Sequence, residues 1–321
     1  MVGTLQRRQE GRFKKLLRLL WKQRTLQMMA IPGVIYFIIF NYLPMPGIII
    51  AFKNFRPFHT IWSAPWAHNN GMQHFIRFFS GDFWMVMRNS LVMSISSLVV
   101  SFPLPILLAI CLNELRSQKF KRVVQTITYF PHFISWIVIG GITLQILHQD
   151  GLVNQVMMNW GLIERPIIFL ARPRMFIPII IITGNWASVG FSSILFLAAI
   201  AGIDQEQYEA ATIDGATRFQ KARHITVPAM ATIITLMLIL AISNLLGNNF
   251  AQIMVLRNPL NRVRADVIEV YAFIQGMGVA GQIEQNFSFG TAVGLFNSVV
   301  SVILLLIANF VANKVNGQGL F

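Results

Sequence analysis

The sequence is short of charge. Only 12% of its 321 residues are Asp, Glu, Lys or Arg, whereas 55% are hydrophobic and the mean hydropathy is +0.59. This charged share is about half that of a typical soluble protein, which excludes nearly all soluble single-chain enzymes. The charge is also one-sided, with 26 Lys and Arg against 12 Asp and Glu. The basic residues lie between long apolar runs, so we expect them to mark membrane topology and expect no nucleic-acid partner.

Motifs that carry chemistry are equally scarce. The single cysteine, Cys111, lies in an apolar run, so no disulfide framework or cysteine-based metal site is available, and we expect a small buried hydrophobe there. No HExxH motif, paired intramembrane carboxylates or Ser/His/Asp arrangement can be assembled, and no GxxxxGKS or GxxxxGKT loop for ATP occurs. We therefore expect a non-enzymatic chain that binds no metal and no cofactor of its own.

Long apolar runs dominate what is present. A helix needs about 20 apolar residues to cross the hydrocarbon core of a bilayer. Six windows of this kind occur, at Leu26–Phe52, Asn89–Asn113, Val123–Leu147, Phe176–Ile200, Ala229–Leu256 and Phe287–Ala312. None has the alternating pattern of barrel strands, so each is predicted to be a helix that satisfies its own backbone hydrogen bonds. The predicted fold class is all-α integral membrane, with six transmembrane helices.

Basic residues are unequally divided between the connecting segments. With a cytoplasmic N-terminus, the inside segments hold 16 Lys and Arg and the outside segments hold 10, and eight of the former precede the first span. Basic residues are retained on the cytoplasmic side of membranes. We therefore expect a multi-pass protein of the bacterial cytoplasmic (inner) membrane with both termini in the cytoplasm.

The chain is predicted to have two parts, a basic segment over residues 1–25 and a membrane domain over residues 26–321. From Arg12 to Arg24, basic and apolar residues interleave, which favours a cytoplasmic amphipathic helix lying on anionic lipids. A cleaved signal peptide is the competing interpretation. The apolar run that follows is too long for a signal peptide and lacks a small-x-small cleavage site.

The six spans contain no Asp, Glu, Lys or Arg. Ion-coupled carriers usually place such a residue in the membrane as a coupling site, so a secondary carrier is the weaker alternative. His132 in the third span is a possible proton relay. Pro131 beside it predicts a disrupted helix, so a structural or substrate-facing histidine is favoured.

Neutral polar and aromatic side chains do occur in the spans. Hydroxyl, amide and indole groups can hold a sugar by hydrogen bonds and ring stacking. Hydrogen bonding between helices is the competing role for each of them. The candidate substrate path consists of Ser135, Trp136, Asn185, Trp186, Asn244, Asn248, Asn249, Gln252 and Asn297.

Two glycine patterns occur, and only the second predicts a structural feature. Gly276 to Gly281 reads GxGxxG, but it follows no predicted strand and opens no βαβ unit, so we reject a nucleotide site. Gly290 and Gly294 form a GxxxG at the start of the sixth span. This pattern predicts the close approach of another helix.

The cytoplasmic segment 202–228 is polar but has the signals of ordered structure. Asp204 with Gln207, and Thr217 with Gln220, have capping-box spacing, which predicts two short helices.

A turn and an apolar ridge complete this segment. Gly215 suits the turn between the two helices, and Pro228 suits the first turn of the fifth span. The ridge would insert into a groove on another protein, or else the segment is an ordinary hairpin lying on the membrane. Its residues are Tyr208, Ala211, Thr212, Gly215 and Phe219.

One motif in the segment is specific. Glu209-Ala210-Ala211, three residues, Gly215, nine residues and then Ile225-x-Val227-Pro228 resembles the EAA loop of permeases of binding-protein-dependent ABC importers, with Val227 in place of leucine. In that family the loop forms coupling helices that dock in a cleft of the ATP-hydrolysing subunit. The resemblance implies a type I importer (MetI-like) fold, with Glu209 docking or bracing the loop and Gly215 forming its turn. The implied ATPase-coupling residues are Glu209, Ala210, Ala211, Asp214, Gly215, Phe219 and Pro228.

Other segments extend the resemblance over about residues 20 to 320. They are similar to sugar permeases of the LplB-like branch, whose members import oligosaccharides and polysaccharides, including pectin- and alginate-derived chains. The segments are Tyr42-Leu-Pro-Met45, Ile50-Ala-Phe-Lys53, Arg88-Asn-Ser90, Leu112-Asn-Glu-Leu115 and Phe130-Pro-His-Phe-Ile-Ser-Trp136.

The resemblance implies alternating access that is driven from outside the chain. The expected partners are a second, homologous permease subunit, two subunits that bind ATP and Mg²⁺, an extracytoplasmic sugar-binding protein, membrane lipids and the saccharide. The outside segments carry a net charge of +4, which suits an acidic saccharide of the alginate or pectin type. A neutral oligosaccharide is the alternative, and an ion-coupled secondary sugar carrier is less favoured.

Overall fold

The computed structural model describes residues 21–278 and 284–316. Within these ranges the secondary structure is helical, apart from an isolated β-bridge between Lys53 and Trp66. The predicted all-α fold is therefore confirmed. Of the basic segment 1–25, only the last five residues belong to the described part of the chain, and the GxGxxG pattern is described only as far as Gly278.

The first half of the chain holds two long apolar helical segments, Arg24–Phe52 and Phe83–Asn113, and several short helices. Its elements are α2 (Arg24–Phe37), η1 (Ile38–Tyr42), η2 (Met45–Phe52), α3 (Gln73–Ser80), α4 (Phe83–Ser101), α5 (Pro103–Asn113), α6 (Gln118–Tyr129), η3 (Phe130–Phe133), α7 (Trp136–Ile146) and α8 (Leu152–Asn159). α4 and α5 together form one apolar segment of 31 residues. Pro103 is accommodated between them because the first turn of a helix needs no N–H donor.

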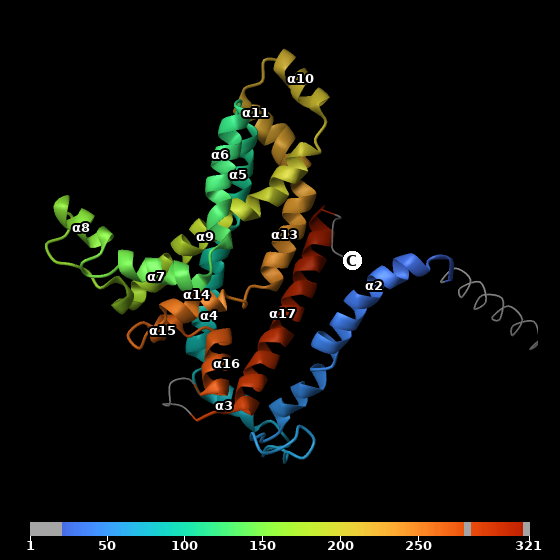
Figure 1. Ribbon diagram of the computed structural model, residues 1–321, viewed down its shortest axis with the longest axis vertical. Helices are drawn as coiled ribbons and strands as arrows, with labels where there is room; N and C mark the ends of the chain where they lie inside the picture. Colours follow the sequence, from blue (N-terminus) through green and yellow to red (C-terminus); the bar gives the residue numbers. More distant parts are fainter. Residues whose placement is uncertain (1–20, 279–283, 317–321) are drawn as a thin grey trace, which may run out of the picture.

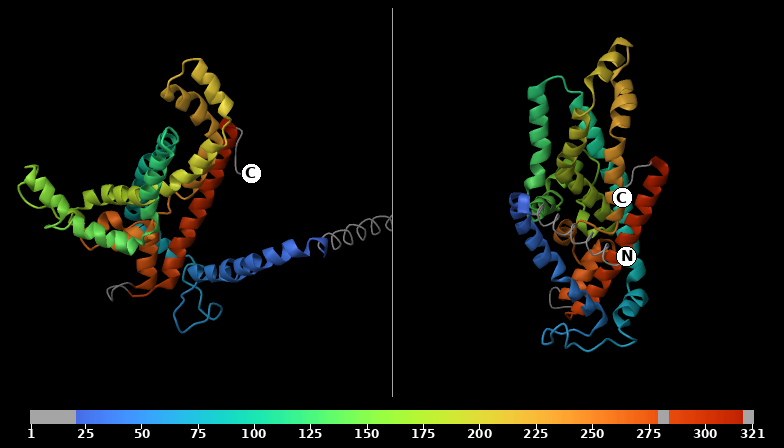
Figure 2. Two further views of the ribbon diagram at one scale, coloured as in Figure 1. Left: turned by 45° about the horizontal axis from the view of Figure 1, so that its top comes forward. Right: turned by 90° about the vertical axis from the view of Figure 1, so that its right-hand side faces the viewer.

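The second half holds the two longest helices. Its elements are η4 (Phe169–Ala171), α9 (Pro173–Ala201), α10 (Gln205–Ile213), α11 (Arg218–Lys221), η5 (Ala222–Thr226), α12 (Val227–Ala229), α13 (Ala231–Ser243), α14 (Phe250–Leu256), α15 (Arg262–Ala265), α16 (Ile268–Met277) and α17 (Phe287–Asn316). α17 runs beside α13 and α16, and α9 packs against α4, α5 and α6. Figure 1 shows α10 and α11 at one tip of the molecule and α2 leaning away from the bundle, as the rotated views in Figure 2 confirm.

Four segments are long and apolar enough to cross a membrane alone. They are Arg24–Phe52, Phe83–Asn113, Pro173–Ala201 and Phe287–Lys314. Two further pairs of helices meet this condition only together, and each pair is sharply bent. The pairs are Gln118–Phe133 with Trp136–Ile146, and Arg218–Ala229 with Ala231–Ser243. If each bent pair is one span, the described residues provide up to six crossings, the number that the sequence predicts, although the second pair begins and ends ahead of the predicted fifth span.

The third predicted span, Val123–Leu147, is not one helix. α6 and α7 meet at 100°, with η3 between them. Pro131 lies in the first turn of η3, and Ser135 then begins α7 by accepting the backbone N–H of Val138. The disruption predicted at Pro131 is therefore confirmed, and the continuous span is wrong.

The histidine of this elbow has a packing contact. The His132 ring stacks on Phe191 of α9, with ring centroids 3.9 Å apart and planes 3° from parallel. The stack holds the elbow against α9, which agrees with a structural histidine.

The fifth predicted span, Ala229–Leu256, is also interrupted. α13 ends at Ser243 and α14 begins at Phe250. The turn between them passes through Gly247, which lies directly against the side-chain amide of Asn244. At the other end, Pro228 lies in α12, and a 63° bend separates it from α13. The expectation that Pro228 begins the spanning helix is therefore wrong.

Cys111 corrects another expectation, since its side chain is exposed on α5 and not buried. Apolar side chains of a membrane helix can face lipid instead of protein, so an apolar run does not imply burial within the chain.

Glycines allow two close helix crossings. A Cβ on Gly290 would lie 2.8 Å from the Cα of Gly276, so α16 and α17 approach at bare backbone. The predicted role of Gly290 is confirmed, whereas Gly294 has no neighbour within 4 Å. A Cβ on Gly190 of α9 would overlap the backbone carbonyl of Thr128 in α6.

Replacing Gly190 by alanine is expected to force α6 and α9 apart. Overpacking of this kind costs about 1–3 kcal/mol, so the unfolding temperature of the Gly190→Ala variant should fall by several degrees. Tryptophan fluorescence of the detergent-solubilised chain during heating measures the effect. Gly141→Ala in α7 is the matched control, because nothing lies within 4 Å of that position. Equal unfolding temperatures for the two variants would contradict the crossing.

Candidate functional site

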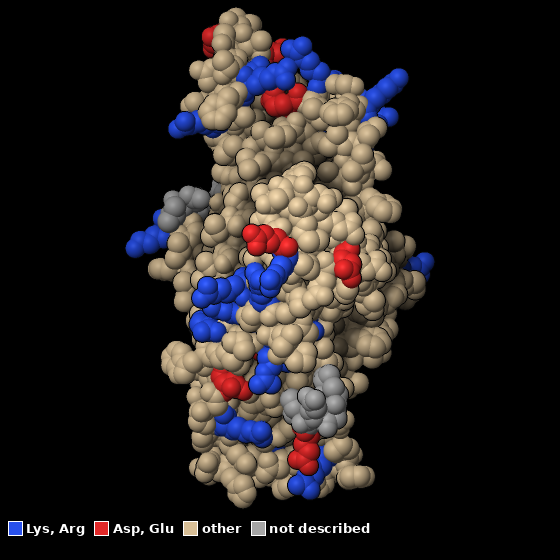
Figure 3. Space-filling view, turned by 90° about the vertical axis from the view of Figure 1, so that its left-hand side faces the viewer, with Lys and Arg blue, Asp and Glu red and all other residues tan. Residues whose placement is uncertain are grey.

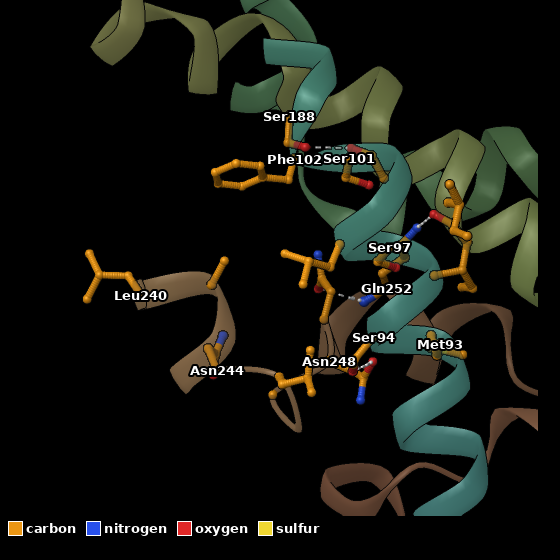
Figure 4. A pocket seen from close by; sticks show the side chains of 18 of the residues that line it. Met93, Ser94, Ser97, Ser101, Phe102, Ser188, Leu240, Asn244, Asn248 and Gln252 are labelled. Carbon is orange, nitrogen blue, oxygen red and sulfur yellow. Dashed lines mark hydrogen bonds between the residues drawn. The ribbon is translucent and has the colours of Figure 1, made fainter. Parts of the chain in front are cut away.

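A cavity of about 420 Å³ lies among α4, α9, α13 and α14, and we call it the chamber. In Figure 4, Leu240 and Asn244 of α13 face the serines of α4 across it, with Gln252 of α14 between them. On α9 the lining includes Gly184 and Ser188, near the middle of a 29-residue helix. The chamber is therefore placed about halfway along the spans.

Three serines of α4 form one wall of the chamber. Ser94, Ser97 and Ser101 are spaced three and four residues apart, so they share one face of the helix. The sequence alone does not single out this wall. The spacing was visible, but an apolar run does not reveal which of its faces is turned toward the cavity.

The opposite wall comes from the interrupted fifth span. The Oδ1 of Asn248 accepts a hydrogen bond of 3.1 Å from the hydroxyl of Ser94. Asn249 begins α14, and its side chain accepts the backbone N–H of Gln252. The Nε2 of Gln252 donates to the carbonyl of Ile180 at 2.8 Å. These contacts fix the amides against α4 and α9.

Five of the nine predicted path residues line the chamber, namely Trp136, Asn244, Asn248, Asn249 and Gln252. The other four lie outside its lining. Ser135 is the N-cap of α7, and Trp186 is half exposed. The Nδ2 of Asn185 donates to the Ser101 hydroxyl at 2.9 Å, behind the wall of α4. Asn297 lies on α17, and its Oδ1 is buried without a hydrogen-bond partner.

The chamber is polar without being charged. Among the described residues that line it, hydroxyl and amide groups account for the polar surface, Phe102 and Trp136 are aromatic, and none is ionisable. Hydroxyls and amides both donate and accept hydrogen bonds, and aromatic rings stack on apolar faces. This combination suits a polyhydroxylated ligand.

A second cavity, of about 460 Å³, continues from the chamber along α9. It shares Phe102 and Leu240 with the chamber, and its further lining includes Phe191, Leu195 and Met237. The apolar side chains of this cavity lie nearer the α10–α11 end of α9. The path therefore changes from polar to apolar in that direction.

The hairpin of residues 202–228 has the two helices that the sequence predicts. The Asp204 side chain begins α10 by accepting the N–H of Glu206 at 3.0 Å, so the expected capping box with Gln207 is wrong. Thr217 and Gln220 do form a capping box at the start of α11. Gly215 makes the turn between the helices with φ of +77°, a conformation that suits glycine.

The apolar face of the hairpin differs from the predicted ridge. The Tyr208 hydroxyl lies 2.9 Å from the Oγ1 of buried Thr226, so this ring faces its own chain. The apolar side chains that face outward are Ile213, which is 87% exposed, and Phe219, which is 74% exposed.

Most of the remaining motif residues are also exposed. Glu209, Ala210 and Pro228 are exposed, and none of the described basic residues forms an ion pair with Glu209. A hollow of about 340 Å³ opens beside the turn and is lined in part by Ala211 and Asp214.

One ion pair joins the hairpin to the membrane part of the chain. The Nε of Arg218 lies 3.8 Å from the Oε2 of Glu114, and its Nη1 donates to the Glu114 carbonyl at 3.3 Å. Glu114 is the C-cap of α5. The hairpin is therefore linked to the rod of α4 and α5, whose other half forms the serine wall of the chamber.

Comparison with known proteins identifies relatives along nearly the whole chain. Protein LplB of Bacillus subtilis is 41% identical over 94% of this chain and 92% of its own length. The polygalacturonan/rhamnogalacturonan transport system permease protein YteP of the same organism is 39% identical over 96% of this chain and 94% of its own.

A solved structure shares the fold. A chain in the crystal structure of a bacterial ABC transporter involved in the import of the acidic polysaccharide alginate superposes with a TM-score of 0.82. The two sequences are 35% identical, and the match covers 94% of this chain and 99% of that one. A chain in the crystal structure of a bacterial alginate ABC transporter in complex with alginate pentasaccharide-bound periplasmic protein matches with the same TM-score and identity.

Residues 101–317 match the family described as binding-protein-dependent transport system inner membrane component. This range includes the hairpin and most of the chamber. Members are transport permeases, so the chain is a non-catalytic membrane subunit and not an enzyme. The chain therefore belongs to the family of inner membrane components of binding-protein-dependent transport systems.

Proposed function

We propose that the chain is the permease subunit of an ATP-driven importer that moves an oligosaccharide or polysaccharide from a binding protein into the cytoplasm. The observation that carries the proposal is the chamber, whose neutral hydrogen-bonding groups and aromatic rings match the surface of a sugar. The relatives named for saccharide transport support the same class of substrate. An ion-coupled carrier is disfavoured because the described lining of the chamber holds no group that could carry the coupling proton.

An acidic saccharide is the favoured substrate. One relative is named for polygalacturonan and rhamnogalacturonan, and the solved neighbour imports alginate. The outside segments carry the net charge of +4, which raises the local concentration of an anion. A neutral oligosaccharide fits the chamber equally well and is the alternative.

In this proposal, conformational changes driven by ATP binding and hydrolysis in the partner subunits reach this subunit through the hairpin. Ile213 and Phe219 offer apolar side chains to a cleft of an ATP-binding subunit, and Gly215 sets the angle between the two helices. The hairpin faces the cytoplasm, with both termini on the same side. A second, homologous permease completes the path, and two partner subunits bind ATP and Mg²⁺.

Reconstitution tests this function. The chain, co-purified with its permease, ATPase and binding-protein partners and placed in liposomes, is expected to take up labelled saccharide only when ATP is inside. Uronate oligomers are expected to compete for uptake better than neutral oligomers of equal length. The isolated chain is expected to hydrolyse no ATP. Uptake that needs no ATP and is abolished by a protonophore would establish the carrier instead.

Removing chamber groups is expected to weaken the binding of substrate. Asn244 and Ser97 line the chamber and have no side-chain partner in the described structure, so they are available to a ligand. Each hydrogen bond contributes about 0.5–1.5 kcal/mol, so Asn244→Ala and Ser97→Ala should each raise the half-saturating saccharide concentration by about 2–12-fold. Concentration-dependent uptake in liposomes measures this. Ser96→Ala, on α4 but outside the lining, is the control and should behave as wild type.

Distorting the turn of the hairpin is expected to uncouple transport. At a φ of +77°, glutamate or leucine in place of Gly215 is strained by about 1–2 kcal/mol and projects from the tip that faces the ATPase. Gly215→Glu and Gly215→Leu should insert normally but lose assembly with the ATPase and saccharide uptake. Gly202→Ala is the control, because Gly202 has a φ of −86° that alanine adopts freely. Wild-type uptake by the Gly215 variants would reject the docking role.

A further inference from the structure

The segment between α14 and α16 is pinned to the rest of the chain by buried amides. Asn258 and Asn261 both donate from Nδ2 to the carbonyl of Leu170 in η4, each at 3.1 Å. Asn89 of α4 donates to the carbonyl of Asp266 at 3.2 Å. Asn89 and Asn261 are completely buried. The short helix α15 between these contacts is therefore held rigidly beside the start of α9.

Two acidic side chains lie in or next to this segment, and both are withdrawn from the surface to some extent. Asp266 is 8% exposed and accepts from the Nε of Arg257 at 2.6 Å. Glu269 on α16 is half-buried, and burial raises the pKa of its carboxyl above the ordinary value. The Asp266 carboxylate is therefore occupied by Arg257, and neither carboxylate forms an ion pair with Arg172, Arg174, Arg262 or Arg264 in the described residues.

Four arginines remain on the outside of this scaffold, and we call them the arginine platform. They are Arg172 and Arg174 at the start of α9, and Arg262 and Arg264 on α15, which packs against α9. Arg264 is half-buried and the other three are exposed. Within the described parts of the chain, none of the four side chains has an ion pair or hydrogen bond. Figure 3 shows Lys and Arg gathered midway along this face, with acidic side chains at the edge of the group.

Two features of the platform disfavour its positive charge. Arg172 is the N-cap of α9 and Arg174 lies in its first turn, where the helix dipole repels cations. No acidic residue occurs in that turn. Four like charges on one rigid surface also repel each other. An acidic ligand would relieve both effects.

The platform lies apart from the chamber. A buried apolar cluster that includes Phe176, Ile253 and Ala265 occupies the region between the platform and the chamber lining. A saccharide bound to the platform would therefore not be in the path. The hairpin lies at the opposite end of α9, and 29 helical residues span about 43 Å. With the hairpin in the cytoplasm, the platform faces outward.

We propose that the arginine platform is an electrostatic docking surface for an acidic patch on the substrate-binding protein. This proposal rests on the proposed function, because that function supplies both the partner and the orientation. Guanidinium groups pair with carboxylates in fixed bidentate geometry, so the platform orients the partner as well as attracting it. Complementary surface charge acts mainly on the rate of association, and its effect falls with salt.

The test uses the complete transporter in lipid nanodiscs with its own binding protein, in the absence and presence of saccharide. ATP hydrolysis is measured against binding-protein concentration at 50 and 200 mM salt. Two variants, Arg262→Gln/Arg264→Gln and Arg172→Gln/Arg174→Gln, each remove two charges. Each is expected to raise the half-stimulating concentration roughly tenfold at the lower salt. The rate at saturation should be unchanged, and the salt dependence should become shallower.

The control removes the same charge from the other side of the membrane. Arg116→Gln/Lys119→Gln, in the connection between α5 and α6 and in the first turn of α6, should leave the half-stimulating concentration as in wild type. Platform variants that match wild type at both salt concentrations would overturn the proposal. A defect that disappears in nanodiscs of neutral lipid would also overturn it, because the platform would then bind lipid headgroups. So would variants that change only the saccharide concentration needed for half-maximal ATP hydrolysis. If the binding protein does not stimulate ATP hydrolysis even by the wild-type transporter, the proposed function fails and this proposal fails with it.

Discussion

The constraint on which the structure depends is backbone hydrogen bonding in a medium without water. Lipid offers no partner to a free N–H or C=O, so a helix can break inside the membrane only where protein or a wet cavity replaces the lost bonds. The breaks between α6 and α7 and between α13 and α14 meet this condition. Ser135 begins α7 and Asn249 begins α14 by side-chain capping, and Trp136 and Asn244 beside them line the chamber. The polar chamber and the broken helices therefore require each other.

The sequence predicts the number and approximate places of the spans because crossing a bilayer demands length and apolar composition. It does not predict the bends. A window of about 20 residues averages hydropathy over Pro131 or Gly247 and registers no break. The sequence also predicts only part of the chamber lining. Amides are conspicuous in an apolar run, so Asn248 and Gln252 were found, whereas Ser94 is inconspicuous and Asn297 is conspicuous but faces elsewhere.

The hairpin was predicted in more detail because its signals are local. Capping residues and a glycine turn act within three or four positions, and Thr217, Gln220 and Gly215 behave as their spacing indicates. The link from Arg218 to Glu114 spans 104 residues of sequence and had no signal that could be read without the fold. It makes the hairpin continuous with the serine wall of α4 through α5. A local motif thereby becomes part of a rod that reaches the chamber.

The neutral lining of the chamber has an electrical consequence. A protein that moves no charge of its own through the membrane does no work against the membrane potential when it changes conformation. The potential then acts on the cargo alone, at about 2.3 kcal/mol for each elementary charge per 100 mV. For a uronate chain entering a cell that is negative inside, this cost grows with every carboxylate. It would fall entirely on the hydrolysis of ATP, so long acidic chains would be energetically more demanding cargo than neutral chains of equal size.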